Sequence, residues 1–119
     1  MSDDRIRAAA RALTEALETR VPIAPLASSL HSLEEAYQVQ ALHMSERETA
    51  DNPLVGHKVG LTSEAVRRQL GVDQPDFGIL LADMEIHDGG QIDMRRLIQP
   101  KVEAEIAFVL DTDVDEVDR

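Results

Sequence analysis

Hydrophobic side chains recur at helical spacing along the first part of the chain. The repeat predicts a helix from about Asp3 to Thr19, with an apolar stripe made by Ile6, Ala9, Ala10, Leu13, Ala16 and Leu17. The helix cannot continue through Val21-Pro22-Ile23-Ala24-Pro25, because each proline restricts the residue before it.

A second helix is predicted to begin at Ser32. Ser32 and Glu35 have the spacing of a capping box, in which the side chains at the start of a helix satisfy its free amides. The stripe that follows is Leu33, Ala36, Tyr37, Gln40, Ala41 and Met44. This helix is expected to end before Asp51-Asn52-Pro53.

Short apolar runs punctuated by glycine predict strands after the two helices. One strand is expected over Leu54–Leu61 and another over Ile79–Met84. Between them, Thr62 or Ser63 can cap a short third helix that runs through Leu70 and is stopped by Gly71.

The clearest strand pattern spans Lys101 to Leu110. One face would carry Val102, Ala104, Ile106, Phe108 and Leu110, and the other would carry Lys101, Glu103, Glu105, Ala107 and Val109. The order of elements favours an α+β fold. A strand with one apolar face needs sheet neighbours, so this pattern indicates a truncated chain whose sheet is unfinished.

Charge and composition narrow the class of partner. The 119 residues hold 23 acidic side chains against 12 Lys and Arg, a net charge of -11. This balance argues against nucleic acid and against an anionic membrane as partners, but not against a small anionic substrate. The chain has no cysteine, no signal peptide and no apolar run long enough to span a membrane, so we expect a cytoplasmic protein.

Glu103 and Glu105 are the sharpest local chemical feature. Spacing of two on a strand places both carboxylates on one face, where a hard cation such as Mg²⁺ or Mn²⁺ would neutralise their repulsion. From spacing alone, a solvated polar face is the simpler interpretation.

Other candidates carry less information by themselves. Lys58 lies between glycines in an apolar run and could act as an acid or a base, or hold a carboxylate. From the residues alone, a surface lysine whose stem packs along the strand is the better interpretation. Asp73, Asp76 and Asp83 surround a loop, where aspartate commonly bonds nearby amides. The histidines show no metal-ligand spacing and are interpreted as surface or structural residues.

Three blocks of sequence resemble one enzyme family. They are Gly56–Ser63, Gln69–Gly78 and Gln99–Ala107, and Ile23–Leu26 fits the same family upstream. In order and in register they are similar to the 2-keto-4-pentenoate hydratase and 4-oxalocrotonate decarboxylase family of the fumarylacetoacetase superfamily. The resemblance implies an N-terminal helical region over 1–52 and the start of a β-rich catalytic domain, an incomplete mixed β-roll, over 53–119.

The resemblance also implies a site and a reaction. Glu103 and Glu105 match two of three acids that bind Mg²⁺ or Mn²⁺, the third falling past Arg119, while Lys58 and Asp76 match catalytic residues. The implied activity is a hydro-lyase of aromatic catabolism that hydrates 2-hydroxypenta-2,4-dienoate to 4-hydroxy-2-oxopentanoate, in a homo-oligomer. Two alternatives stay open: a decarboxylase acting on 2-oxo-3-hexenedioate, and a truncated non-catalytic chain that only associates with full-length subunits.

Overall fold

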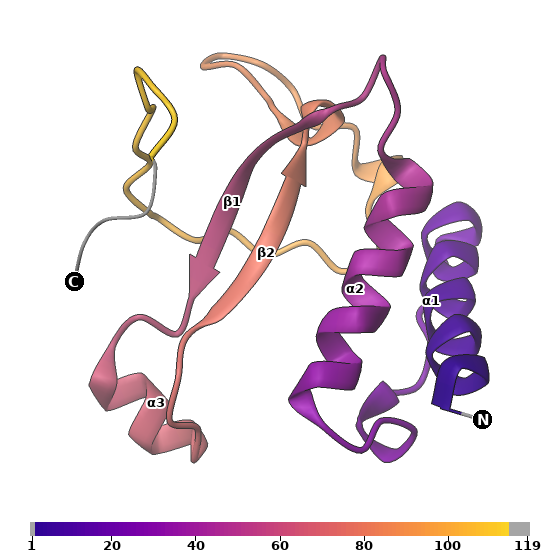
Figure 1. Ribbon diagram of the computed structural model, residues 1–119. Helices are drawn as coiled ribbons and strands as arrows, with labels where there is room; N and C mark the ends of the chain where they lie inside the picture. Colours follow the sequence, from indigo (N-terminus) through magenta and orange to yellow (C-terminus); the bar gives the residue numbers. More distant parts are fainter. Residues whose placement is uncertain (1, 115–119) are drawn as a thin grey trace.

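The fold combines a helical pair with a small β-hairpin, as an α+β class predicts. The computed structural model describes residues 2–114 (Figure 1). The helices are α1 (Ser2–Thr19), α2 (Leu33–Arg47) and α3 (Glu64–Leu70), and the strands are β1 (Leu54–Gly60) and β2 (Asp76–Leu81). Short 3-10 turns occupy Leu26–Ser28, Ala82–Met84 and Met94–Arg96. No helix among the described residues is long and apolar enough to cross a membrane.

Helices α1 and α2 pack side by side through the apolar stripe predicted for α1 (Figure 1). The buried cluster is Ile6, Ala9, Ala10 and Val39, with Leu13, Leu26, Leu30 and Leu42 packed against it. The two alanines let the helix backbones approach closely, because small side chains leave little between them. An ion pair between Arg5 and Glu35, 2.9 Å from Nη2 to Oε1, fastens the same two helices at their edge.

The cap predicted for α2 is confirmed in its first half. Ser32 Oγ accepts a hydrogen bond from the Glu35 amide at 3.1 Å. The Glu35 carboxylate accepts from the amide of His31 at 2.8 Å, where the expected capping box would have it accept from Ser32. The helix therefore begins where the sequence indicates, with a shifted second bond.

Strands β1 and β2 form an antiparallel pair in which α3 sits in the connection (Figure 1). The α3 boundaries agree with prediction, since Ser63 Oγ accepts from the Val66 amide and Gly71 ends the helix at φ 72°. The prediction of β2 over 79–84 was displaced: the strand begins at Asp76, and Ala82–Met84 form a 3-10 turn. Pairing with the end of β1 recruits Asp76 and Phe77, which local propensity assigned to a loop.

Helix α2 also covers the outer edge of β2. Tyr37 Oη accepts from the Phe77 amide at 3.1 Å, and Gln40 Nε2 donates to the Phe77 carbonyl at 3.1 Å. An unpaired strand edge exposes such groups to other chains, so the two contacts satisfy the edge at this residue. They also fix β2 relative to the helical pair.

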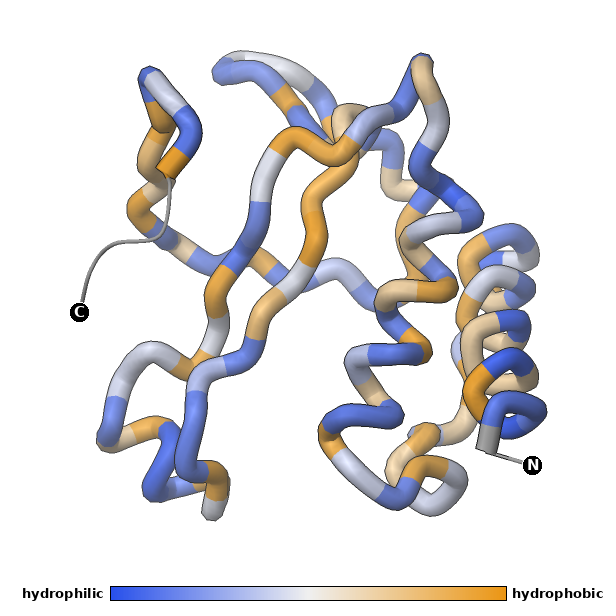
Figure 2. Tube along the Cα trace, in the orientation of Figure 1, coloured by the Kyte–Doolittle hydropathy of each residue, from blue (hydrophilic) through white to orange (hydrophobic). Residues whose placement is uncertain are grey.

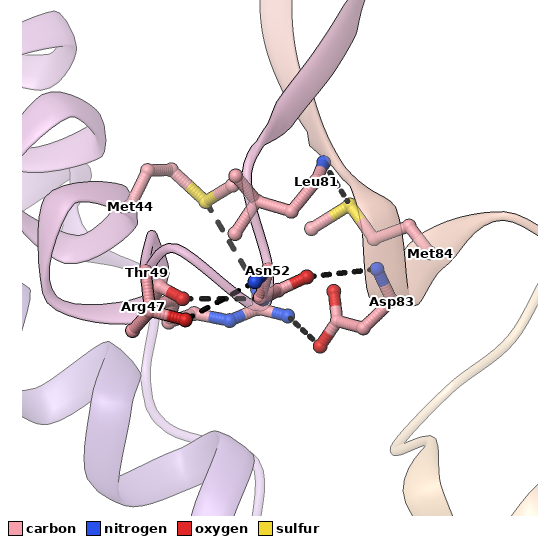
Figure 3. Close-up of polar contacts among 7 residues, drawn as sticks. All are labelled: Met44, Arg47, Thr49, Asn52, Leu81, Asp83 and Met84. Carbon is pink, nitrogen blue, oxygen red and sulfur yellow. Dashed lines mark hydrogen bonds and ion pairs between the residues drawn. The ribbon is translucent and has the colours of Figure 1, made fainter.

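Asn52, in the loop between α2 and β1, links the end of α2 by hydrogen bonds to the turn that follows β2 (Figure 3). Asn52 Nδ2 donates to the Arg47 carbonyl at 3.1 Å, and Asn52 Oδ1 accepts from the Asp83 amide at 2.8 Å. Arg47 and Asp83 form an ion pair at 3.5 Å. Leu81 is fully buried beside them, which for a leucine contributes about 1.5–3 kcal/mol. The division into helical and β-rich regions at residues 52 and 53 stays a prediction.

The strand predicted over Lys101–Leu110 was wrong for the described residues. This segment has no regular secondary structure, and its apolar side chains are exposed, with Val102 at 100% and Val109 at 97%. Figure 2 shows hydrophobic positions recurring along it, away from the helical pair. A strand exists only through hydrogen bonds to a neighbour, and none of the described residues pairs with this segment.

Candidate functional site

Lys58 and Asp76 lie on the same face of the β1–β2 hairpin. Lys58 pairs with Gly78 and Gly60 pairs with Asp76, so both side chains share one face of the sheet. Diagonal positions of this kind are about 7–8 Å apart, within reach of a long lysine side chain and a bound small molecule. Both residues are exposed in the described chain. The structure thus brings together the two residues predicted to be catalytic.

Each of these side chains lies across a glycine on the opposite strand. A Cβ at Gly78 would come within 2.8 Å of Lys58 Cγ, closer than Cβ atoms approach other atoms. A Cβ at Gly60 would overlap the Asp76 carboxylate. The sequence alone indicates the last part of a strand at Gly60 and a loop at Gly78. Their spacing from Lys58 and Asp76 was visible, but their function depends on the register of the two strands.

The turn that follows β1 has an unusual backbone and a dedicated arginine. Leu61 has φ 55°, in the left-handed region that side chains other than glycine rarely adopt. Arg67 Nη1 donates to the Leu61 carbonyl at 2.8 Å and to the Thr62 carbonyl at 2.9 Å. This left-handed residue ends β1 one position before the predicted limit, and sequence reasoning did not single out Arg67.

Glu103 and Glu105 do not form a complete metal site with the other described residues. Both lie in the exposed segment without regular structure. Within residues 2–114, no group of three or more His, Cys, Asp and Glu side chains is arranged to hold a metal ion. Carboxylate oxygens are the right kind of ligand for Mg²⁺ or Mn²⁺, but two of them are fewer than such a site uses. Their function as metal ligands stays a prediction.

The remaining predicted candidates have structural surroundings. Asp83 is held by Arg47 and by Asn52, as described for the loop. His43 lies 3.0 Å from Thr14 Oγ1 between α1 and α2. Burial lowers the pKa of His43 below 6.5, the Arg47 charge lowers it further, and Glu46 opposes them.

Two further features lie away from Lys58 and Asp76. In the turn near residue 94, hydrogen bonds from Arg95 lower the pKa of Asp93, whose side chain is 40% exposed. A mainly apolar hollow of about 370 Å³ opens beside the helical pair and is lined by Leu13, Ala16, Leu17, Pro22, Ile23, His43, Arg47, Ile98 and Gln99. Neither feature shares a residue with the β-hairpin.

Comparison with known proteins adds an independent line of argument. No protein-family model matches the chain. The chain is 47% identical over 112 residues to the TodF product hydratase of Pseudomonas putida, covering 92% of this chain and 42% of that protein. It is 43% identical over 117 residues to a 2-keto-4-pentenoate hydratase of Paraburkholderia xenovorans, covering 97% of this chain and 44% of the relative. A third relative, 2-keto-4-pentenoate hydratase 2 of Dechloromonas aromatica, is 50% identical over 109 residues, covering 90% of this chain and 42% of the relative.

These matches cover nearly all of the chain but less than half of each relative. They include the blocks around Lys58 and Asp76, since the alignments cover 90–97% of this chain. Over nearly its whole length, the chain therefore matches an N-terminal portion of 2-keto-4-pentenoate hydratases.

Proposed function

We propose that this chain supplies Lys58 and Asp76 to the active site of a cytoplasmic, metal-dependent hydratase. The proposed substrate is 2-hydroxypenta-2,4-dienoate and the product is 4-hydroxy-2-oxopentanoate. One observation carries the proposal: a lysine and an aspartate share one sheet face, each across a glycine, in a chain 43–50% identical to proteins named as such hydratases.

The reaction divides into a proton transfer and a hydration. The 2-hydroxyl group loses its proton while the terminal carbon gains one, which converts the dienol to an α,β-unsaturated ketone. The oxygen of water then bonds to carbon 4, and a proton is delivered to carbon 3. Both stages need groups that hold and move protons at fixed positions.

Lys58 and Asp76 are suited to these two tasks. The Lys58 ammonium can hold the substrate carboxylate or transfer a proton on its side of the substrate. The Asp76 carboxylate can orient a water molecule and accept its proton. Their common face lets one small molecule contact both side chains, with the glycines leaving the space.

The proposal includes Mg²⁺ or Mn²⁺, with Glu103 and Glu105 as two of its ligands. The ion, when bound, would supply positive charge to the carboxylate and the 2-oxygen of the substrate. In the proposed enzyme, which we expect to be a homo-oligomer, the two carboxylates would work with ligands additional to the residues described in this structure.

Turnover by the full-length protein tests the assignment. Lys58→Ala and Asp76→Asn should each lower kcat by about 100-fold or more, the usual contribution of a general acid or base. Lys101→Ala and Asp73→Asn are matched controls, since each removes the same charge elsewhere, and both should retain activity. Unchanged turnover in Lys58→Ala would remove the lysine from the mechanism.

The length of the substrate tail is the next variable. The chain is also 40% identical to a 2-hydroxyhexa-2,4-dienoate hydratase of Comamonas testosteroni over 120 residues. We expect the five-carbon dienoate to give the higher kcat/KM, because the more similar relatives carry the pentenoate name. Decarboxylation of 2-oxo-3-hexenedioate to carbon dioxide and 2-hydroxypenta-2,4-dienoate, without hydration of either dienoate, would instead identify the decarboxylase.

A further inference from the structure

We propose that Arg67 is a positioning residue for the proposed active site. It holds the left-handed turn at Leu61 and thereby sets the end of β1 against Asp76. The inference rests on the proposed function of Asp76 and goes beyond it, because Arg67 is assigned no contact with the substrate.

The turn needs an external restraint. Leu61 adopts φ 55°, which places the Cβ of an ordinary residue close to the following carbonyl. Non-glycine residues held in this region usually depend on surrounding contacts, and such residues concentrate at functional sites. Here the contacts are the two bonds that Arg67 Nη1 donates to the carbonyls of Leu61 and Thr62.

Arg67 is well placed to act as that restraint. Its own amide donates to the Ser63 carbonyl at 3.0 Å, and its carbonyl accepts from the Val72 amide at 3.0 Å, so the backbone is fixed at both ends of α3. The side chain reaches back over the first turn and is half-buried. A guanidinium stays charged at any working pH, and hydrogen bonds from charged donors are stronger than neutral ones.

The neighbouring arginine provides a contrast. Arg68 lies on the same helix, but its side chain is 77% exposed and, among the described residues, forms an ion pair with Glu64, one turn earlier. Surface pairs of this type contribute little to a fold. Arg68 therefore has the same charge as Arg67 and is its neighbour on the same helix, but it is not the arginine that bonds to the turn.

The restraint reaches the proposed site through Gly60. This glycine immediately precedes Leu61 and pairs with Asp76, whose carboxylate occupies the space that a Cβ at Gly60 would fill. A change in the backbone angles of Leu61 rotates Gly60 against that carboxylate. Lys58 is two residues further from the turn and faces Gly78, so its placement depends less on Arg67.

Three variants of the full-length protein test the proposal by kinetics. Arg67→Ala should lower kcat by about tenfold or more with a smaller change in KM, since small displacements of a catalytic group reduce rate steeply. Its pH–rate profile should also differ from that of the wild-type enzyme. Arg67→Lys should recover part of the loss, and Arg68→Ala should behave as wild type.

A rescue variant separates positioning from a general structural role. Glycine adopts the left-handed conformation without strain, so Leu61→Gly combined with Arg67→Ala should restore part of the lost kcat, measured against Leu61→Gly alone. A purely structural Arg67 would lower the amount of folded enzyme without shifting the pH profile, and the glycine would not restore kcat. Those results would overturn the proposal.

An NMR measurement keeps the test independent of activity. The amide resonances of Gly60 and Asp76 should move in Arg67→Ala and stay in place in Arg68→Ala. Unmoved resonances would refute the positioning role even if the wild-type protein hydrates no dienoate. Moved resonances in a protein without hydratase activity would retain the positioning role and refute the proposed function alone.

Discussion

Gly60 and Gly78 show how single atoms set the geometry of the candidate site. Each lacks a Cβ at the point where a catalytic candidate from the other strand passes. At Gly78 the neighbour is the flexible stem of Lys58, and at Gly60 it is the carboxylate of Asp76. Substitution at these positions should therefore affect side-chain placement more than folding.

Alanine at either glycine should lower activity more than stability. We expect Gly60→Ala and Gly78→Ala to reduce kcat of the full-length protein by about tenfold or more, because the opposing side chain must move. Gly71→Ala is the control: no atom crowds it, but its φ of 72° should reduce the free energy of unfolding by about 1–2 kcal/mol. Steady-state kinetics and urea unfolding of the three variants measure the contrast, and the same kcat loss in all three would contradict it.

The carboxylate pair leads to a second prediction at this scale. Glu103 and Glu105 alone should give the 119-residue polypeptide a Mn²⁺ affinity of millimolar or weaker, because two ligands fall short of the six or so oxygens that hard cations take. Titration followed by calorimetry or electron paramagnetic resonance measures this. A micromolar Kd that disappears in Glu103→Gln/Glu105→Gln would show that the ligand set is already sufficient.

At the scale of elements, the α1–α2 pair contains a titratable group. His43 is partly buried, with Thr14, Arg47 and Glu46 around it, and its pKa is lowered from 6.5. The unfolded chain therefore binds more protons than the folded chain between the folded pKa and 6.5. Stability that is fully present above pH 6.5 should be lost as the pH falls through the folded pKa.

Removing the imidazole of His43 should make the stability of the protein less dependent on pH. The urea midpoint of the wild-type protein is expected to decrease when the pH is lowered from 7.5 to roughly a unit below the ordinary histidine pKa of about 6.5. The urea midpoint of the His43→Gln variant should decrease less over the same pH range. His87→Gln is a suitable control, because the His87 side chain is 89% exposed. If the urea midpoint of His43→Gln decreased with pH as steeply as that of wild type, the acid sensitivity would belong to other groups.

Elements stabilised by local interactions could be predicted from the sequence, and those defined by distant partners could not. Ser32, Ser63 and Gly71 mark helix ends through bonds to residues three or four positions away, and all three act as expected. The start of β2 depends on pairing between Asp76 and Gly60, sixteen positions apart, so its boundary was misplaced. The segment 101–110 has the alternation of a strand but lacks a neighbour among the described residues.

The same distinction applies to the site. Lys58 and Asp76 were identified by their resemblance to a family, and the strand register then explains why they face one side. Arg67 was not predicted from the sequence because its function depends on a left-handed turn, and the residues around Leu61 do not indicate a positive φ. A leucine is an unfavourable residue there, so propensity points away from the observed conformation.

At the scale of the whole molecule, one apolar segment is left uncovered in the described structure. Ile106 and Phe108 are both 85% exposed, and the acidic chain holds few other large apolar groups so open to water. Extended apolar segments of this kind are prone to pair with other chains. The 119-residue polypeptide should therefore self-associate at micromolar concentration.

Polar substitution should suppress that association. Ile106→Ser/Phe108→Ser is expected to lower the apparent mass in light scattering and delay aggregation, because it removes two exposed apolar side chains without adding charge. Ala107→Ser, which changes the small side chain between these two residues, is the control and should associate as wild type. If the double variant associated as strongly as wild type, the surface responsible for self-association would lie elsewhere on the molecule.

The contacts of Phe77 have a consequence for how this sheet can be extended. In an antiparallel pair, alternate residues direct both backbone groups away from the neighbouring strand, and those of Phe77 are taken by Tyr37 and Gln40. A third strand on that side would have to displace α2. Among the described residues, no strand lies beside the outer edge of β1. A further strand can therefore pair with β1, on the side of the sheet away from the helical pair, without displacing α2.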